Sequence, residues 1–333
     1  MNSNHPILSV RNLSIDFQAD TQYIHAVSNV SFDMFPGEIL GLVGESGSGK
    51  SVTAMSILRL ISIPPGFIKN GKIMYEDKDL LQIPVHLLRK IRGNRISMIF
   101  QEPMSALSPL HRIGRQLVEQ QQFHQKIDKK SAWEQAKFQL QRVGIPDVDE
   151  RMYNYPFQLS GGLQQRVMIA MAFMMQPDII IADEPTTALD VTIQAQIFDC
   201  ILEMKTQQTT ILMITHDMGV VWNMCDRMMV MYASKIVEQG PVKEIFQKPA
   251  HPYTKGLLTS IPSLTHRRKK LPVIPGQIPD MSKLPEGCAF YQRCPYRLTK
   301  CQEEPPPFTK IAQNHHSACF MAEKLMNNQP TLT

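Results

Sequence analysis

Short apolar segments that fit β-strands recur along the chain as far as about residue 215. Strands are predicted at residues 7–10, 13–17, 26–34 and 39–43. The last of these is a continuous apolar run, as expected for a strand that is buried on both faces. Two further buried strands are predicted at residues 179–182 and 210–214. The chain is therefore expected to build its core around a sheet.

Segments with helical periodicity lie between these strands. Helices are predicted at residues 52–60, 163–175 and 192–205. Because strands that alternate with helices form parallel sheets, the pattern predicts an α/β fold. The stretch 102–158 is polar and rich in Gln, with amphipathic segments such as 131–143, and it indicates a helical insertion. Together with the next helix it predicts a helical subdomain over about 102–175.

The composition fits a globular protein with a large and a small domain. A chain of 333 residues is long enough for two domains of the usual ~100–200 residues. Hydrophobic residues make up 43% and charged residues 20%, which excludes a disordered or fibrous chain. No run approaches the ~20 apolar residues of a membrane-spanning helix, and the first residues lack the pattern of a signal peptide. A cytosolic protein is expected, and the net charge of +5 is diagnostic of no partner.

The C-terminal part differs in composition from the rest. Beyond residue 249 prolines accumulate, and a basic run at 267–270 interrupts the apolar pattern. We therefore expect one domain over residues 1–249 and a small Pro- and Cys-rich extension over residues 250–333.

A glycine-rich loop follows the strand at 39–43. It matches the pattern G-x-x-x-x-G-K-[ST] between a strand and a helix, which is the context of a phosphate-binding loop. Its backbone N–H groups can turn inward around phosphate oxygens. Lys50 is expected to neutralise the β- and γ-phosphates, and Ser51 to place its hydroxyl on Mg²⁺. The loop consists of Gly44, Glu45, Ser46, Gly47, Ser48, Gly49, Lys50 and Ser51. It predicts binding of a nucleoside triphosphate.

Two carboxylates close the buried strand at 179–182. Asp183 and Glu184 follow it directly, and a parallel sheet binds ligands at that edge. Asp183 is predicted to hold Mg²⁺, and Glu184 to orient and partly deprotonate an attacking water. Solvated acids at a strand end are the alternative, which the nearby phosphate loop disfavours.

A second candidate anion site precedes the helix at 163–175. Ser160 is a good N-cap, and Gly161 and Gly162 leave backbone N–H groups open, so this helix end can hold an anion. An ordinary capped helix would have the same residues. Taken alone, the segment leaves both interpretations open.

The motifs and their order resemble those of the ABC ATPase family over about residues 5–247, and Leu159-Ser160-Gly161-Gly162 is similar to its signature sequence. The resemblance implies additional site residues. They are Gln101 of the Q-loop, which also reaches Mg²⁺; Asp190 of the D-loop at 188–190; the switch histidine His216; and Phe17, which stacks on adenine, with Tyr23 as a weaker candidate.

The same resemblance implies how the site works. Glu184 acts as the base for water, Lys50 and His216 stabilise the γ-phosphate, and Gln101 connects the site to the helical subdomain. Two such domains form a head-to-tail sandwich, so that each ATP lies between the phosphate loop of one subunit and residues 160–162 of the other. The expected cofactors are ATP and Mg²⁺.

The tail resembles that of a narrower family. Residues 251–258 are similar to the opening of the C-terminal extension of oligopeptide and dipeptide importer ATPases, and Gly287-Cys288 and Arg293-Cys294-Pro295 are typical of it. The resemblance implies an ATPase that energises peptide uptake at the cytoplasmic face of the cell membrane. It implies as partners a second ATPase chain that differs from this one, two membrane-spanning permease subunits and an extracytoplasmic peptide-binding protein, with no nucleic acid.

Four cysteines of the extension form the pattern C-x5-C-x6-C-x17-C at Cys288, Cys294, Cys301 and Cys319. Four thiolates in a Pro-rich segment with little core of its own suggest a metal centre. Zinc and iron–sulfur clusters both use four cysteines, but the spacing lacks the C-x2-C pairs usual for zinc. The family resemblance favours a [4Fe-4S] cluster; zinc and unligated buried thiols remain the alternatives.

The other candidate residues are expected to be structural. Cys200 and Cys225 are predicted to lie on helices as small buried residues, and His315-His316 in a solvated turn. The alternative functions are a soluble ABC ATPase that acts on nucleic acid or ribosomes with a metal-binding recognition tail, and a scaffold that binds ATP without hydrolysing it.

Overall fold

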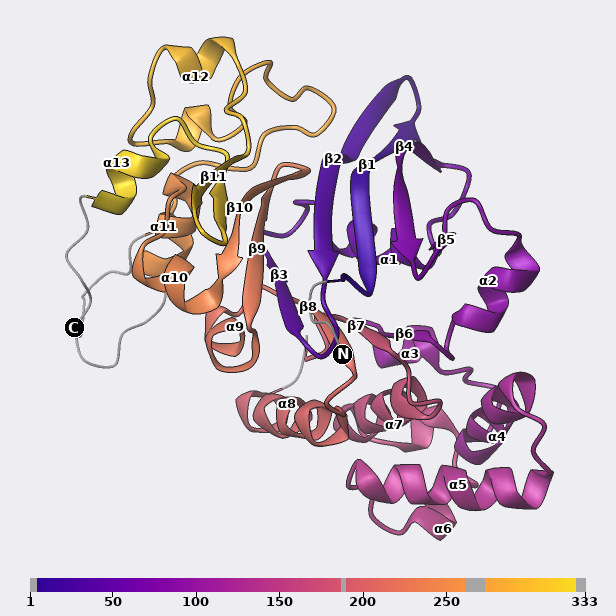
Figure 1. Cartoon of the computed structure of the whole chain (residues 1–333). Helices are drawn as coiled ribbons and strands as arrows, with labels where there is room; N and C mark the ends of the chain where they lie inside the picture. Colours follow the sequence, from indigo (N-terminus) through magenta and orange to yellow (C-terminus); the bar gives the residue numbers. More distant parts are fainter. Residues whose placement is uncertain (1–4, 187–189, 261–272, 328–333) are drawn as a thin grey trace. The chain divides into compact units, whose positions relative to one another are not determined.

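The computed structural model describes residues 5–186, 190–260 and 273–327 (Figure 1). These residues form two compact units. The first unit consists mainly of Phe35–Glu38 and Gln82–Met213, and the second of Pro6–Met34, Ile39–Leu81 and the described residues from Ile214 onward. Part of the predicted D-loop, residues 188 and 189, and the basic run at 267–270 lie outside the described residues.

The N-terminal part of the second unit forms an antiparallel sheet. Its strands are β1 (Leu8–Ala19), β2 (Gln22–Met34), β4 (Gly66–Tyr75) and β5 (Lys78–Asp79), in the order β2-β1-β4-β5. The sequence pattern predicts two strands where β1 is continuous. The apparent break coincides with a shift in register between Val10 and Leu13, where Asn12 has a φ of 50°.

A second group of strands in this unit is mixed in direction. The strands are β3 (Ile39–Val43), β9 (Arg227–Tyr232), β10 (Lys235–Pro241), β11 (Thr309–Ala312) and β12 (His315–Ser317). β3 pairs in parallel with β9, whereas β9–β10, β10–β12 and β11–β12 pair antiparallel. Every residue of β3 is buried, as the continuous apolar run predicts. The mixed-sheet core is thereby confirmed.

Short helices complete the second unit. They are α1 (Lys50–Ile57), α9 (Met218–Met224), α10 (Val242–Gln247), α11 (Pro252–Thr259), η2 (Tyr291–Arg293), α12 (Lys300–Glu303) and α13 (Ala322–Asn327). α1 begins two residues before its predicted start, at the lysine of the phosphate loop. Cys225 lies just after α9 rather than on a helix, as its C-cap.

The first unit combines buried strands with most of the long helices. Its strands are β6 (Ile96–Ile99), β7 (Ile179–Asp183) and β8 (Thr210–Thr215), whose last two residues fall in the second unit. β6 and β7 pair in parallel, and β8 is the next strand beyond β7. The helices are α2 (Val85–Ile91), α3 (Pro103–Ala106), α4 (Ile113–His124), α5 (Lys129–Arg142), α6 (Val148–Arg151), η1 (Pro156–Gln158), α7 (Gly161–Phe173) and α8 (Val191–Met204).

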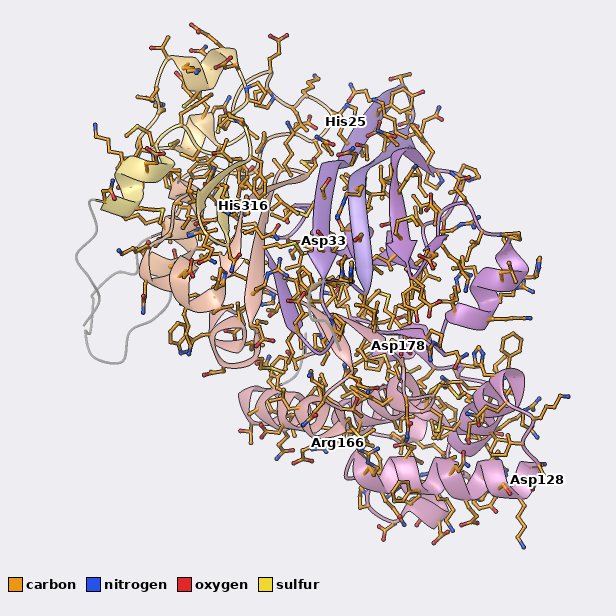
Figure 2. All side chains as sticks on the ribbon, in the orientation of Figure 1. His25, Asp33, Asp128, Arg166, Asp178 and His316 are labelled. Carbon is orange, nitrogen blue, oxygen red and sulfur yellow. The ribbon has the colours of Figure 1, made fainter. Side chains whose placement is uncertain are left out.

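Five of the described helices, α3, α4, α5, α6 and η1, lie within residues 102–158. α4, α5 and α7 lie side by side within the first unit (Figure 1). Arg166 on α7 (Figure 2) donates from Nη1 to the carbonyl oxygen of Val143, 2.6 Å away, and from Nη2 to Oε1 of Gln196 on α8, 3.0 Å away. One guanidinium therefore connects α7 to the end of α5 and to α8. Among the described residues, no helix combines the length and the apolar character needed to cross a membrane.

The prediction of a solvated turn at His315-His316 is wrong. His315 lies on β12 with no exposed surface, and its Nε2 is 2.7 Å from Oε1 of the equally buried Glu238 on β10. The Glu238 carboxylate also accepts hydrogen bonds from the backbone N–H groups of Ala250 and His251. The sequence suggested solvent because His is polar, whereas a buried carboxylate here supplies the partner that makes its burial tolerable.

His251 is a buried histidine whose protonation is linked to folding. It is 1% exposed, and its Nδ1 accepts a hydrogen bond from the N–H of Tyr253 at the start of α11. Burial lowers the pKa of His251 from its usual 6.5 to about 3. The folded state therefore holds it neutral at pH values where the unfolded chain binds a proton. The stability linked to the neutral ring is present above pH 6.5 and is lost as the pH falls toward 3.

We expect His251→Asn to flatten the fall of the unfolding free energy between pH 7 and pH 5. Asparagine offers an Oδ1 acceptor for the N–H of Tyr253 but does not titrate, so the variant lacks a loss of up to ~1.4 kcal/mol per pH unit. Urea unfolding at a series of pH values measures this. The exposed His86 provides the matched control, because His86→Asn should keep the wild-type slope. Parallel curves for wild type and His251→Asn would contradict the assignment.

Candidate functional site

The phosphate loop of the second unit runs from the end of β3 to the start of α1. Gly44 and Gly49 have φ values of 153° and 107°. A Cβ on Gly44 would lie 2.2 Å from the carbonyl oxygen of Met231, and one on Gly49 would lie 2.2 Å from that of Ala26. The backbone of β9 and β2 thus approaches too closely for any other residue. The loop is fixed in a form that only glycine permits.

Lys50 lies inside this loop. Its side chain is buried, and Nζ donates to the carbonyl oxygens of Gly44 at 2.9 Å and Glu45 at 3.0 Å. Ser48 is fully buried, and its Oγ has no hydrogen-bond partner among the described residues. A cation and an unpaired hydroxyl surrounded by loop backbone suit an anionic ligand. Ser51 follows on α1 and is half-buried.

The two predicted carboxylates lie in the first unit at the end of β7. Asp183 is 5% exposed and is the last residue of the strand. Glu184 has a φ of 44°, a left-handed conformation that is uncommon for a residue other than glycine. Gln101 follows β6, the strand parallel to β7, and its Nε2 donates to Oε2 of Glu184 over 3.4 Å. The structure therefore brings Gln101 and Glu184 together.

The signature segment also belongs to the first unit. Ser160 is the N-cap of α7, and its side chain accepts a hydrogen bond from the N–H of Leu163 at 3.4 Å, which confirms the predicted cap. Gly161 and Gly162 form the first turn of this helix. Asp190 caps α8 by accepting from the N–H of Ile193 at 3.0 Å. The signature segment and the D-loop residue Asp190 therefore each lie at the N-terminus of a helix.

The remaining predicted nucleotide residues lie in the second unit. His216 is exposed and directly follows β8. Phe17 is half-buried on β1, whereas Tyr23 on β2 is 51% exposed and packs edge-on against Phe67 with ring centroids 5.7 Å apart. Of the two aromatic residues, Tyr23 is therefore the more exposed.

The predicted metal centre is not supported as such. Within the described residues, no group of three or more His, Cys, Asp or Glu side chains is arranged to hold a metal ion. The side chains of Cys288, Cys294, Cys301 and Cys319 nevertheless line one small pocket, which we call the thiol pocket. The four thiols are thus neighbours, as the sequence predicts, without a ready-made coordination site.

Burial shapes the chemistry of the thiol pocket. It raises the pKa of Cys288 to about 11 and that of Cys319 to about 12, and neighbouring thiols add to both shifts. The pKa of Cys294 is also raised by burial. Thiolates are costly in this pocket unless a cation compensates them.

Two contacts to the phosphate loop escape sequence reasoning. Tyr253 on α11 and Arg293 on η2 both hydrogen-bond to Glu45, 208 and 248 residues away in the sequence. Both stand in segments that resemble the C-terminal extension of peptide-importer ATPases, 251–258 and 293–295, but neither residue is predicted to contact the phosphate loop. That is the only signal the sequence offers for them.

Comparisons with known proteins identify the family. The profile of the ABC transporter family matches residues 27–187, and that of the C-terminal region of oligopeptide/dipeptide transporters matches residues 237–301. Two solved structures share the fold. One is a dimeric ATP-binding cassette bound to ADP and Pi, with a TM-score of 0.63 and 25% identity. The other is cbiO1 of Clostridium perfringens, described as part of an ABC transporter complex, with a TM-score of 0.59 and 25% identity. They cover 71% and 72% of this chain, and 98% and 90% of their own. The ABC ATPase fold is confirmed.

Curated relatives match almost the whole chain. A probable peptide ABC transporter ATP-binding protein of Sinorhizobium fredii is 44% identical over 96% of both chains. Two proteins of Bacillus subtilis are each 46% identical: an oligopeptide transport ATP-binding protein over 93% of this chain and 87% of its own, and a dipeptide transport ATP-binding protein over 96% and 95%. The chain therefore belongs to the ATP-binding proteins of the ABC transporter family that carry the oligopeptide/dipeptide transporter C-terminal region.

Proposed function

We propose that this chain is the ATP-hydrolysing subunit of an ABC importer for dipeptides or oligopeptides. One observation carries the proposal: an ABC transporter segment and an oligopeptide/dipeptide transporter C-terminal region occur together in one chain. Relatives named for peptide, oligopeptide and dipeptide transport match at least 93% of it. Short peptides are therefore the class of cargo that we assign.

The same match disfavours the alternatives. A soluble ATPase acting on nucleic acid or ribosomes would have no use for the C-terminal region found in peptide transporters. A scaffold that binds ATP without hydrolysing it would not need the full set of Lys50, Asp183, Glu184 and His216.

ATP binding starts from the phosphate loop. Its backbone N–H groups at the start of α1 surround the phosphates, and Lys50 exchanges its bonds to loop carbonyls for bonds to the β- and γ-phosphate oxygens. Ser51, Asp183 and Gln101 offer the oxygen atoms that Mg²⁺ prefers, and the bound ion would neutralise phosphate charge. Phe17 stacks on the adenine ring.

Hydrolysis is an in-line attack of water on the γ-phosphorus. Glu184 accepts the proton of the water as the new P–O bond forms, and the bond to the β-phosphate oxygen breaks to release ADP. Lys50 and His216 stabilise the charge on the γ-phosphate. Because Gln101 hydrogen-bonds to Glu184, it can pass a change at the γ-phosphate on to the helical part of the first unit.

We further propose that the ATP site is completed by a second ATPase subunit. Ser160, Gly161 and Gly162 would contact the ATP held by the partner's phosphate loop, with the D-loop residue Asp190 nearby. The N-terminus of α7 has the open N–H groups that this requires. The complex would sit at the cytoplasmic face of the membrane, on two permease subunits that receive peptide from an extracytoplasmic binding protein.

The helical part of the first unit offers the surface for the permease. Several large apolar side chains are exposed there, including Leu110 at 81%, Phe157 at 66% and Phe123 at 65%. Exposed apolar side chains of this size favour a helix-in-groove contact with a partner. We assign residues 102–158 as the docking region for a cytoplasmic helix of the permease.

The thiol pocket is our candidate for a [4Fe-4S] cluster, with zinc as the alternative. Four cysteines around one pocket provide the donor set that either group requires. Because burial raises the pKa values of Cys288 and Cys319, loading would release protons and the cation would offset the charge of the thiolates. The role that we expect for the bound group is structural or regulatory.

We expect Glu184→Gln to lower ATP turnover in the assembled transporter by about 100-fold or more, which is the usual cost of losing a general base. ATP binding should persist, because glutamine keeps the size of the side chain. Phosphate release and nucleotide affinity are the two measurements. Glu203→Gln, at an exposed glutamate on α8, is the control and should hydrolyse like wild type. Equal turnover in Glu184→Gln would rule out this base.

Anaerobic purification should yield protein with equal amounts of iron and acid-labile sulfide. Cys301→Ser should lose both, because one cluster ligand is missing, whereas Cys200→Ser on α8 should keep both. Elemental analysis and visible absorbance measure this. Zinc without iron would favour a zinc site, and a metal-free wild type would indicate four unligated thiols.

A further inference from the structure

Tyr253 and Arg293 contact the same residue of the phosphate loop. The hydroxyl of Tyr253 accepts a hydrogen bond from the backbone N–H of Glu45 at 2.8 Å. The guanidinium of Arg293 donates two hydrogen bonds to the carboxylate of Glu45, from Nη1 to Oε2 at 2.8 Å and from Nη2 to Oε1 at 3.0 Å. Both main-chain and side-chain groups of Glu45 are thus held from the C-terminal segment.

Arg293 is itself firmly held. Its side chain is 6% exposed, and Nε donates to the carbonyl oxygen of Pro275 at 2.9 Å. The guanidinium carbon lies 5.7 Å from the ring centroid of Tyr232 and 5.9 Å from that of Phe290. Because its neighbours already fix this guanidinium, pairing with Glu45 costs little additional side-chain conformational entropy. The ion pair with Glu45 is therefore strong for one that is partly exposed.

Tyr253 is fixed in a similar way. It is fully buried, with its ring centroid 4.6 Å from that of Tyr232 and 5.6 Å from that of Phe290. Burial raises the pKa of its phenol, so the hydroxyl stays neutral. Arg293 and Tyr253 therefore approach Glu45 from one aromatic cluster, which consists of Tyr232, Tyr253 and Phe290.

The charge of Glu45 explains why this matters for a nucleotide. A carboxylate in the phosphate loop repels phosphate unless a cation neutralises it. Lys50 donates to the carbonyl oxygen of Glu45, not to its carboxylate. Among the described residues, Arg293 is the cation that pairs with this carboxylate, and it supplies the neutralising charge.

We propose that Arg293 and Tyr253 are positioning residues for nucleotide binding. They hold Glu45 so that the loop is shaped before ATP arrives, and Arg293 cancels the negative charge of Glu45. If only a fraction of the molecules had the loop in the binding-competent conformation, the apparent affinity for nucleotide would be reduced in proportion to that fraction. The inference rests on the proposed ATP binding.

The test measures the affinity of the purified full chain for MgATP and MgADP. Arg293→Gln leaves the Glu45 carboxylate unpaired and should weaken both ligands about tenfold, as expected for the loss of one charge-assisted pair. Glu45→Gln added to Arg293→Gln removes the repulsion and should restore most of that loss. Tyr253→Phe should weaken both ligands about threefold. The exposed Arg297 gives the control, and Arg297→Gln should bind like wild type.

The outcomes separate this inference from the proposed function. A wild type that does not bind MgATP would refute ATP binding itself. A wild type that binds, with Arg293→Gln binding equally well, would overturn only the inference. Equal weakness in Arg293→Gln and in the double variant would also overturn it, because a purely structural role predicts no rescue.

A milder variant covers the case in which Arg293→Gln does not fold. Arg293→Lys keeps the charge but cannot pair with two bonds, so MgATP and MgADP should each weaken about threefold. ATP turnover at saturation should not change, because Arg293 touches no reacting atom. Unchanged affinity, or a loss of turnover at unchanged affinity, would contradict the assignment.

Discussion

A buried carboxylate must be satisfied by hydrogen bonds, and in the second unit this constraint acts through Glu238. Without exposed surface, it accepts from the N–H groups of Ala250 and His251 and contacts His315. These contacts fix where α11 begins, and therefore where Tyr253 lies. Tyr253 then reaches the phosphate loop at Glu45. The order of the nucleotide loop thus depends on a polar group in the protein interior, far from it in sequence.

Local sequence patterns predict the elements that build the nucleotide motifs. β3, β7 and β8 are continuous apolar runs, and α1, α5, α7 and α8 have helical spacing, so both their type and their approximate limits follow from the sequence. β4 escapes prediction because Gly71 and polar residues interrupt its pattern. β11 and β12 have four and three residues, too few for a periodicity to show. Burial of His315 depends on Glu238, 77 residues away.

The site divides in the same way. The spacing of the glycines, Lys50 and Ser51 predicts the phosphate loop from local sequence alone. The two carboxylates after β7 are predicted from local sequence in the same way. The contact between Gln101 and Glu184 follows from the parallel pairing of β6 and β7, and β6 is not among the strands predicted from the sequence. The hydrogen bonds of Tyr253 and Arg293 with Glu45 join residues more than 200 positions apart, and no local sequence pattern predicts such contacts. The four cysteines are predicted as neighbours, but their geometry is not.

The contacts of Tyr253 and Arg293 with Glu45 also have a consequence for synthesis of the chain on the ribosome. The phosphate loop is made early, but its two supports come from residues 253 and 293. At the usual ~5–20 residues per second, the 248 residues between Glu45 and Arg293 take about 12 to 50 s to translate. During that interval the nascent loop lacks its neutralising arginine. On the proposed role of Arg293, the polypeptide therefore reaches its full nucleotide affinity only late in translation, after the ATPase motifs have been made.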